Sequence, residues 1–121
     1  MMVLMRATLR SLSFDPEPST LPADAAAFAF NARLIVGPVD GPGEESFDVT
    51  VCSPEWLAER SRTEGIVDGL HHVVVAVASF DQRVLHTWFE ARVNAVEGGD
   101  WATVAGQLGR LGWWEFEGYR P

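Results

Sequence analysis

The chain lacks lysine altogether and has a single cysteine among its 121 residues. All nine basic residues are arginine, which, together with the abundant alanine and glycine, is typical of a GC-rich coding sequence rather than of a function. Cys52 has no second cysteine with which to form an internal disulfide. Metal sites built on paired cysteines are excluded for the same reason.

Long apolar runs are also missing. No stretch approaches the ~20 apolar residues that a membrane-spanning helix needs. The opening Met-Met-Val-Leu-Met-Arg is too short an apolar run for a signal-peptide core. We therefore expect a cytoplasmic, soluble protein, with residues 1–121 forming one domain.

Positive charge is scarce, and the formal net charge is −8. Nucleic-acid phosphates and anionic membrane surfaces are usually bound by clustered Lys and Arg, so we expect neither as a partner. A basic protein would instead be attracted over a long range, mainly as a faster association rate.

Three segments near the start of the chain alternate apolar and polar residues, as half-buried strands do: 3–12, 27–36 and 46–52. The last two flank residues 37–43, which are rich in Gly and Pro, and this arrangement favours an antiparallel hairpin. The inward-facing side chains predicted for these two strands are Phe28, Phe30, Ala32, Leu34, Val36, Phe47, Val49 and Val51.

Helix signals follow. Ser53 and Pro54 predict a helix start, with an end near Arg62. Asp81 predicts the cap of a second helix that ends at Gly98-Gly99, and Asp100 the cap of a third that stops at Gly112. The broad apolar stripe expected to be buried on the second helix consists of Val84, Leu85, Trp88, Phe89 and Val96.

Two further strands are expected late in the chain. Residues 72–78 are nearly all Val and Ala, which indicates a strand buried on both faces and central in the sheet. Residues 113–119 alternate and predict a short edge strand. Strands that cluster early and helices that cluster late favour an α+β fold: a mainly antiparallel sheet of about four to five strands packed with two to three helices on one side.

Catalytic and metal chemistry is weakly represented. His71 and His72 are adjacent and would point to opposite faces of a strand, which disfavours one shared metal. Cys52 with a histidine is a conceivable thiol nucleophile beside a helix start, but free cysteines are usually buried and structural. The loop 37–43 holds three glycines, but two prolines replace amide donors that a phosphate cradle would use, and no lysine follows. We expect no cofactor and no metal.

Acidic residues are concentrated in one segment. Residues 44–59 hold five acids and no base, and so carry five of the eight net negative charges. Because the segment spans a strand and the next helix start, we expect one negative surface for a partner, although a charge run is often only a solvated face. The candidate contact residues in this segment are Glu44, Glu45, Asp48, Glu55 and Glu59.

The C-terminal segment offers further candidates. Trp113, Glu115 and Glu117 are of the kinds that anchor or flank interfaces. The alternative is that the tryptophans complete the core, and this interpretation is favoured for Trp114.

The stretch Glu45-Ser46-Phe47-Asp48-Val49-Thr50-Val51-Cys52-Ser53-Pro54-Glu55-Trp56-Leu57 resembles the signature of the immunity protein 8 family of bacterial polymorphic-toxin systems. Three other stretches are similar in type and order: Leu34-Ile35-Val36-Gly37-Pro38, the helix of Trp101, and Leu111-Gly112-Trp113-Trp114-Glu115-Phe116-Glu117.

The resemblance implies a non-enzymatic protein that neutralises a toxin by binding it, without a cofactor. With the acidic segment, it leads to the hypothesis that the partner is a cognate toxin domain that is basic and of the nuclease type. Two alternatives stay open: an enzyme that uses Cys52, and a small intracellular adaptor or subunit unrelated to toxins. The sequence specifies neither the toxin nor an oligomeric state.

Overall fold

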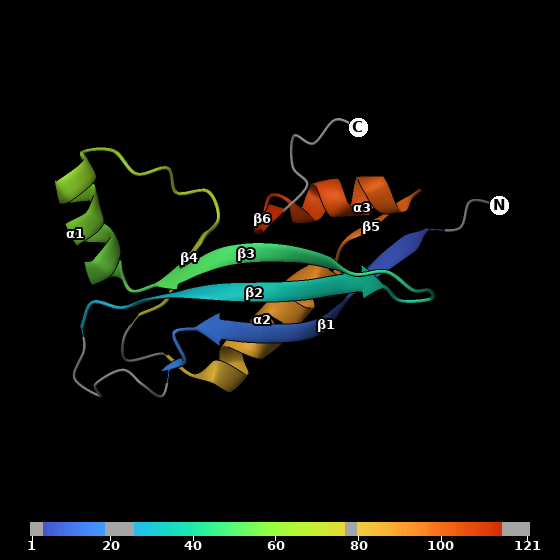
Figure 1. The fold of residues 1–121 in the computed structure, drawn as a ribbon, viewed down its shortest axis with the longest axis horizontal. Helices are drawn as coiled ribbons and strands as arrows, with labels where there is room; N and C mark the ends of the chain where they lie inside the picture. The colour runs from blue at the N-terminus through green and yellow to red at the C-terminus, as the bar shows by residue number, and fades with distance from the viewer. Residues whose placement is uncertain (1–3, 19–25, 77–79, 115–121) are drawn as a thin grey trace.

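The computed structural model describes residues 4–18, 26–76 and 80–114, which form a curled mixed sheet with three helices (Figure 1). The predicted α+β class is confirmed. The strands are β1 (Met5–Asp15), β2 (Ala29–Pro38), β3 (Glu45–Cys52), β4 (His72–Val74), β5 (Glu97–Gly98) and β6 (Trp113–Trp114). The helices are α1 (Pro54–Glu64), α2 (Gln82–Asn94) and α3 (Trp101–Leu108).

The strands of this sheet follow the order β4-β3-β2-β1-β5. Neighbours pair antiparallel, as predicted, except for β3 and β4, which are parallel. The expected hairpin is β2–β3. The outer edge of β3 is shared by two short strands: β4 pairs with residues 50–52 and β6 with residues 47–48.

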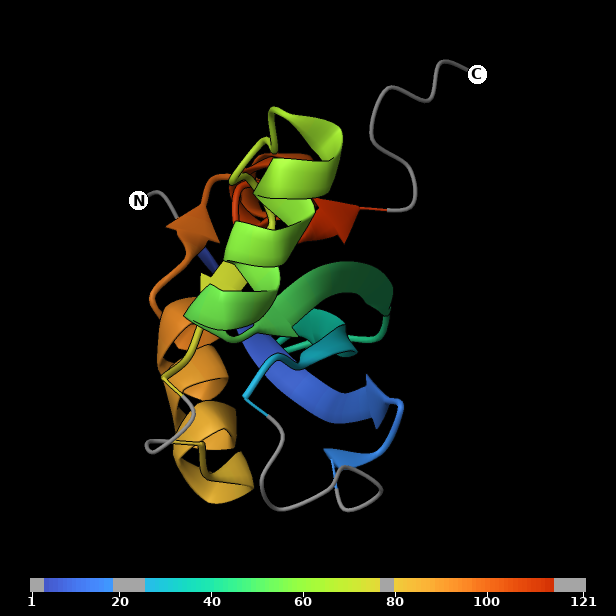
Figure 2. The same cartoon turned by 90° about the vertical axis from the view of Figure 1, so that its left-hand side faces the viewer.

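One face of β2 and β3 supplies the centre of the core. All eight inward-facing side chains predicted for these strands are buried, because successive residues of a strand point to opposite faces. They pack with α2 and α3 in one cluster. Figure 2 shows α2 on one side of the strands, and no described helix covers the other side of β1 and β2. The helix residues of this core are Leu85, Phe89, Val93, Val104, Ala105 and Leu108.

The predicted caps are present. Ser53, Asp81 and Asp100 each accept a hydrogen bond from a backbone N–H in the first turn of the helix that follows. The first helix continues to Glu64 rather than ending near Arg62. The second helix ends at Asn94, before Gly98-Gly99, because Glu97–Gly98 form a strand that the sequence did not indicate.

The buried stripe of α2 is narrower than predicted. Leu85, Phe89 and Val93 are buried, one turn apart. Val84 and Trp88, expected inside, are 63% and 39% exposed. The helix meets the sheet along a single row of residues, and these two side chains lie beside that row rather than on it.

The prediction of a central strand at residues 72–78 is wrong where the structure describes it. Strand β4 has three residues and lies at the end of the strand order. Its Val74 is 48% exposed. The apolar run reflects packing of its half-buried Val73 and Val75 against the core, not burial on both faces. Residues 77–78 of the predicted strand lie outside the described residues.

Gly112 allows the turn after α3 to approach β3 closely. A Cβ atom at this position would lie 2.8 Å from Val49 Cγ2 and 3.1 Å from Phe47 Cβ. Both neighbours are buried and fixed within the sheet, so they have little room to move.

We predict that Gly112→Ala lowers the free energy of unfolding by about 1–3 kcal/mol, because the added methyl overpacks the core. Gly106 is the matched control, since a Cβ there meets nothing within 4 Å and the residue lies within α3. Gly106→Ala should raise stability by about 0.5–1 kcal/mol through helix propensity. Urea unfolding of both variants measures this, and equal effects would contradict the packing argument.

Candidate partner-binding site

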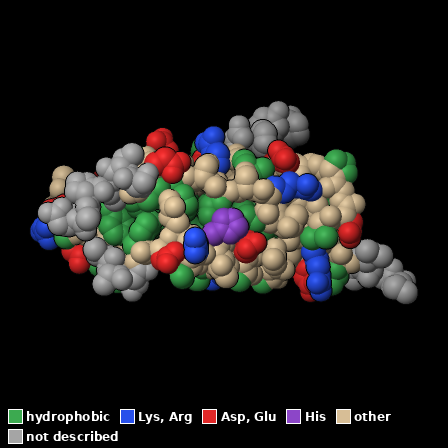
Figure 3. Space-filling model, turned by 90° about the horizontal axis from the view of Figure 1, so that it is seen from below, with side chains coloured by type: hydrophobic (Ala, Val, Ile, Leu, Met, Phe, Trp, Pro, Cys, Tyr) green, Lys and Arg blue, Asp and Glu red, His purple; other side chains and the backbone are tan. Residues whose placement is uncertain are grey.

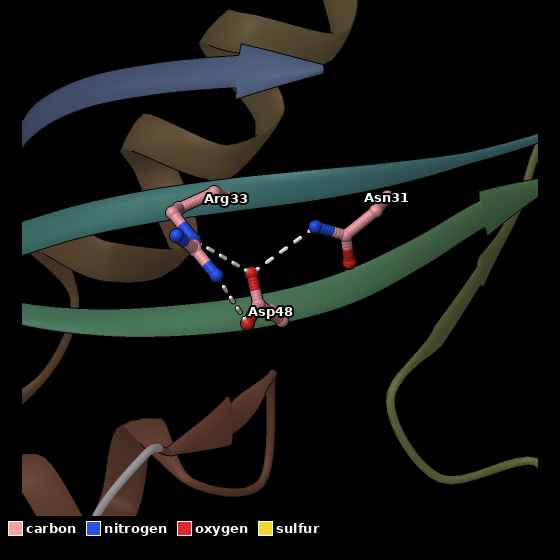
Figure 4. A network of polar contacts seen from close by, with 3 residues as sticks. All are labelled: Asn31, Arg33 and Asp48. Atoms are coloured by element: carbon pink, nitrogen blue, oxygen red, sulfur yellow. Dashed lines mark hydrogen bonds and ion pairs between the residues drawn. The ribbon is translucent and has the colours of Figure 1, made fainter. Parts of the chain in front are cut away.

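Asp48 lies on the side of the sheet opposite the core, and its charge is already paired. Arg33, directly across on β2, donates from Nε and Nη2 to the two carboxylate oxygens at 3.1 and 3.2 Å (Figure 4). Asn31 adds a third hydrogen bond at 3.2 Å. Burial raises the pKa of Asp48, but these hydrogen bonds and the Arg33 charge outweigh it, so the pKa is lowered overall.

Glu45 and Glu44 lie at the start of β3. Glu45 is half-buried and accepts a hydrogen bond from the indole N–H of Trp114 at 3.0 Å. Trp114 stacks on Phe47 at the edge of the core, as favoured from the sequence. Trp113 next to it is 53% exposed. Glu44 is exposed and forms no ion pair with another described residue.

Glu55 and Glu59 lie on α1 beyond the other end of β3, and both are exposed. Strand β3 has eight residues, so at about 3.3 Å per residue its two ends are separated by roughly 23 Å. The five acids of the segment 44–59 therefore occupy three places: the start of β3, the paired Asp48 in its middle, and α1. Glu115 and Glu117 lie outside the described residues.

Helix α1 projects from the end of the sheet, and none of its residues is fully buried. Its start is fixed by Ser53, whose hydroxyl accepts hydrogen bonds from the N–H groups of Trp56 at 3.3 Å and Phe28 at 3.0 Å. Arg60 lies over the ring of Trp56 and forms an ion pair with Glu64. Pro at the first turn and Gly65 at the end complete both caps.

Two apolar grooves were not expected from the sequence. One, of about 420 Å³, lies between α1 and the segment 67–74; we name it the α1 groove. The other, of about 330 Å³, lies between β4 and the first half of α2; we name it the α2 groove. Val84 and Trp88 line the α2 groove, and Val74 lines both. One signal in the sequence could have indicated the α2 groove: the apolar stripe predicted on α2 is too broad to be buried by a single row of contacts with the sheet.

The groups considered for catalysis have structural surroundings. Cys52 is buried, and burial raises the pKa of its thiol, which opposes formation of the thiolate nucleophile. The ring of His71 is 2.6 Å from the carbonyl oxygen of Gly109, and His72 lies beside Trp56. His86 pairs with Glu90 on α2. Within the described residues, no three His, Cys, Asp or Glu side chains gather as a metal site.

None of the described helices has the length and hydropathy needed to cross a bilayer. The fold and its surfaces define a small α+β domain that presents exposed acids and apolar grooves at the α1 end. The chain belongs to the immunity protein 8 family, whose model matches residues 7–119. No curated protein and no solved structure matches it. The family indicates an immunity protein of a toxin system, a role that implies a toxin partner and inhibition rather than catalysis.

The Asp48 cluster makes stability depend on pH in a defined direction. A carboxyl whose pKa is lower in the folded than in the unfolded state stabilises the fold above the unfolded value, near 3.8, and this contribution is lost as the pH falls through the folded value. We predict that Asp48→Asn costs about 1 kcal/mol at pH 7 and much less at pH 2. Urea unfolding at both pH values measures this, and an equal cost at both would contradict the pairing.

Proposed function

We propose that the chain is an immunity protein of a bacterial polymorphic-toxin system that binds a cognate toxin domain and blocks it in the cytoplasm of the producing cell. The observation that carries this proposal is the family match over nearly the whole chain. The raised pKa and full burial of the Cys52 thiol favour binding over thiol chemistry.

The charge of the chain supports a basic toxin domain. A net charge of −8 attracts a basic protein and speeds its association. Nuclease domains bind phosphates with clustered Lys and Arg, so a nuclease-type toxin would present such a surface. An acidic inhibitor is complementary to it.

The exposed acids are the best candidates for this attraction. Glu44, Glu55 and Glu59 reach solvent, and no ion pair of theirs is recorded within the described residues. Glu45 accepts a hydrogen bond from Trp114, and Asp48 forms an ion pair with Arg33, so we assign these two acids the role of fixing the surface rather than of contacting the toxin. Exposed Trp113 is proposed as a further contact with the toxin. Glu115 and Glu117, which lie outside the described residues, are proposed as contacts too.

Co-expression tests the immunity role directly. The protein encoded by the gene immediately upstream should arrest growth when expressed alone, and expression of this chain with it should restore growth and yield a complex that co-purifies. If the upstream product is harmless and no complex forms, the immunity role is contradicted. Co-purification of a harmless upstream product would instead support the alternative of an adaptor or subunit unrelated to toxins.

Charge reversal tests the electrostatic part. We predict that Glu44→Lys, Glu55→Lys and Glu59→Lys together slow association with the upstream product about tenfold at low salt, with a smaller difference at high salt. The control reverses Asp15, Glu90 and Glu97 to Lys, which gives the same net charge elsewhere on the surface. Stopped-flow association rates measure both variants. Equal slowing by the two would show that only the total charge matters.

A further inference from the structure

Exposed apolar side chains are concentrated at one end of the molecule. The described residues include eight large hydrophobic side chains that are exposed, and five of them lie between the end of α1 and the middle of α2. Figure 3 shows the molecule from below, with hydrophobic side chains gathered toward its left-hand end among single charged groups; α1, at the top in Figure 1, lies on the far side of this view. Exposed apolar patches on soluble domains often mark interaction surfaces. The five residues are Ile66, Leu70, Val74, Val84 and Trp88.

The two grooves join at Val74. The α1 groove is lined by Leu57, Val67 and Val74, among others. The α2 groove is lined by Val74, Val84 and Trp88, among others. Because one half-exposed side chain lines both, the grooves form a continuous apolar surface along the edge of β4; we name it the β4-edge surface. Ile66, 89% exposed, follows the C-terminal cap of α1 and directly precedes Val67 of the α1 groove.

This surface is held in a fixed shape although α1 has no buried residue. An isolated helix of 11 residues is marginal in water, since most helical stability comes from packing. Here the two caps, the Arg60–Trp56 contact and the Arg60–Glu64 ion pair support it. The ring of His72 on β4 lies 6.4 Å from that of Trp56, which connects the helix to the sheet edge. A partner would therefore lose little energy in ordering the surface.

The charges around the surface distinguish a basic partner from a second copy. Residues 54–76 and 80–88 carry five acids and three arginines. Arg60 is paired with Glu64, which is one of these five acids, and Arg92, just outside these ranges, lies over the ring of Trp88. Glu55 and Glu59 on α1 and Asp68 and Asp81 beside the grooves are exposed. Two copies of a chain with a net charge of −8 would repel each other across such a rim, whereas Lys and Arg around apolar anchors would be complementary.

We infer that the β4-edge surface is the docking site for the toxin domain, which inserts apolar side chains into the two grooves and places basic residues against Glu55, Glu59 and Asp68. The inference rests on the proposed function and adds to it the place where the toxin binds. Trp88 is the expected main anchor, since partly exposed tryptophans dominate binding energy at many interfaces.

The test replaces exposed apolar residues that contribute little to folding. Ile66→Ser with Val84→Ser removes one side chain at each end of the surface, and Val39→Ser removes an exposed valine from the turn after β2. Binding to the purified product of the upstream gene is measured by titration calorimetry, after thermal melts of each variant. We expect the double variant to bind at least 30-fold more weakly and the Val39 variant to bind as the wild type does.

Each outcome has one meaning. If the wild type binds and protects cells, and the double variant and the Val39 variant both bind as tightly as the wild type, the docking site is wrong while the proposed function stands. If the wild type itself neither binds nor protects, the proposed function fails first. A wild-type dimer in sedimentation that the double variant abolishes would assign the surface to self-association and overturn the inference. Should the double variant melt early, Ile66→Ser and Trp88→Gln tested singly decide in the same way.

Discussion

The hydrogen bonds of Ser53 join three elements: the start of β2, the end of β3 and the start of α1. The exposed surface at the α1 end depends on how these three are held together. The backbone N–H of Ser53 donates to the carbonyl of Phe28, and its hydroxyl accepts from the N–H groups of Phe28 and Trp56. Ser53 is also the one buried polar side chain among the described residues. It therefore fixes β2 against the end of β3 and sets the direction in which α1 leaves the sheet.

The core and the exposed end of the molecule are built from adjacent residues. Next to Ser53, the carbonyl of Cys52 accepts from the N–H of Val75, which fixes the end of β4 at the same corner. From this corner the chain buries Phe28 and Val51 on one side and exposes Val74 on the other. The grooves on both sides of Val74 thus lie where the sheet ends, and the loop residues Val67 and Gly69 complete the lining of the α1 groove.

Local patterns predicted much of this structure. Alternation identified every inward residue of β2 and β3, and Ser53, Asp81 and Asp100 identified the three helix starts, because these signals act over a few residues. The strand at residues 72–78 was misplaced because an apolar run does not reveal which edge it joins. Strand β5 was missed because a strand of two residues is too short to show an alternation of apolar and polar side chains.

The candidate site was less predictable, because its contacts are distant in sequence. Asp48 is paired with Arg33, 15 residues away, and Glu45 with Trp114, 69 residues away. No pattern within the segment 44–59 shows that two of its five acids are engaged while Glu44, Glu55 and Glu59 form no ion pair with another described residue. The exposure of Val84 and Trp88 likewise depends on the single row along which α2 meets the sheet.

Amide hydrogen exchange on the wild-type complex with the upstream gene product locates the binding surface without any substitution. If the toxin docks on the β4-edge surface, amide exchange slows on binding in residues 56–74 and 82–89 and is unchanged at Asn31, Arg33 and Asp48 on the open face of the sheet. Protection confined to that open face, with α1 and α2 unaffected, would contradict docking on the β4-edge surface.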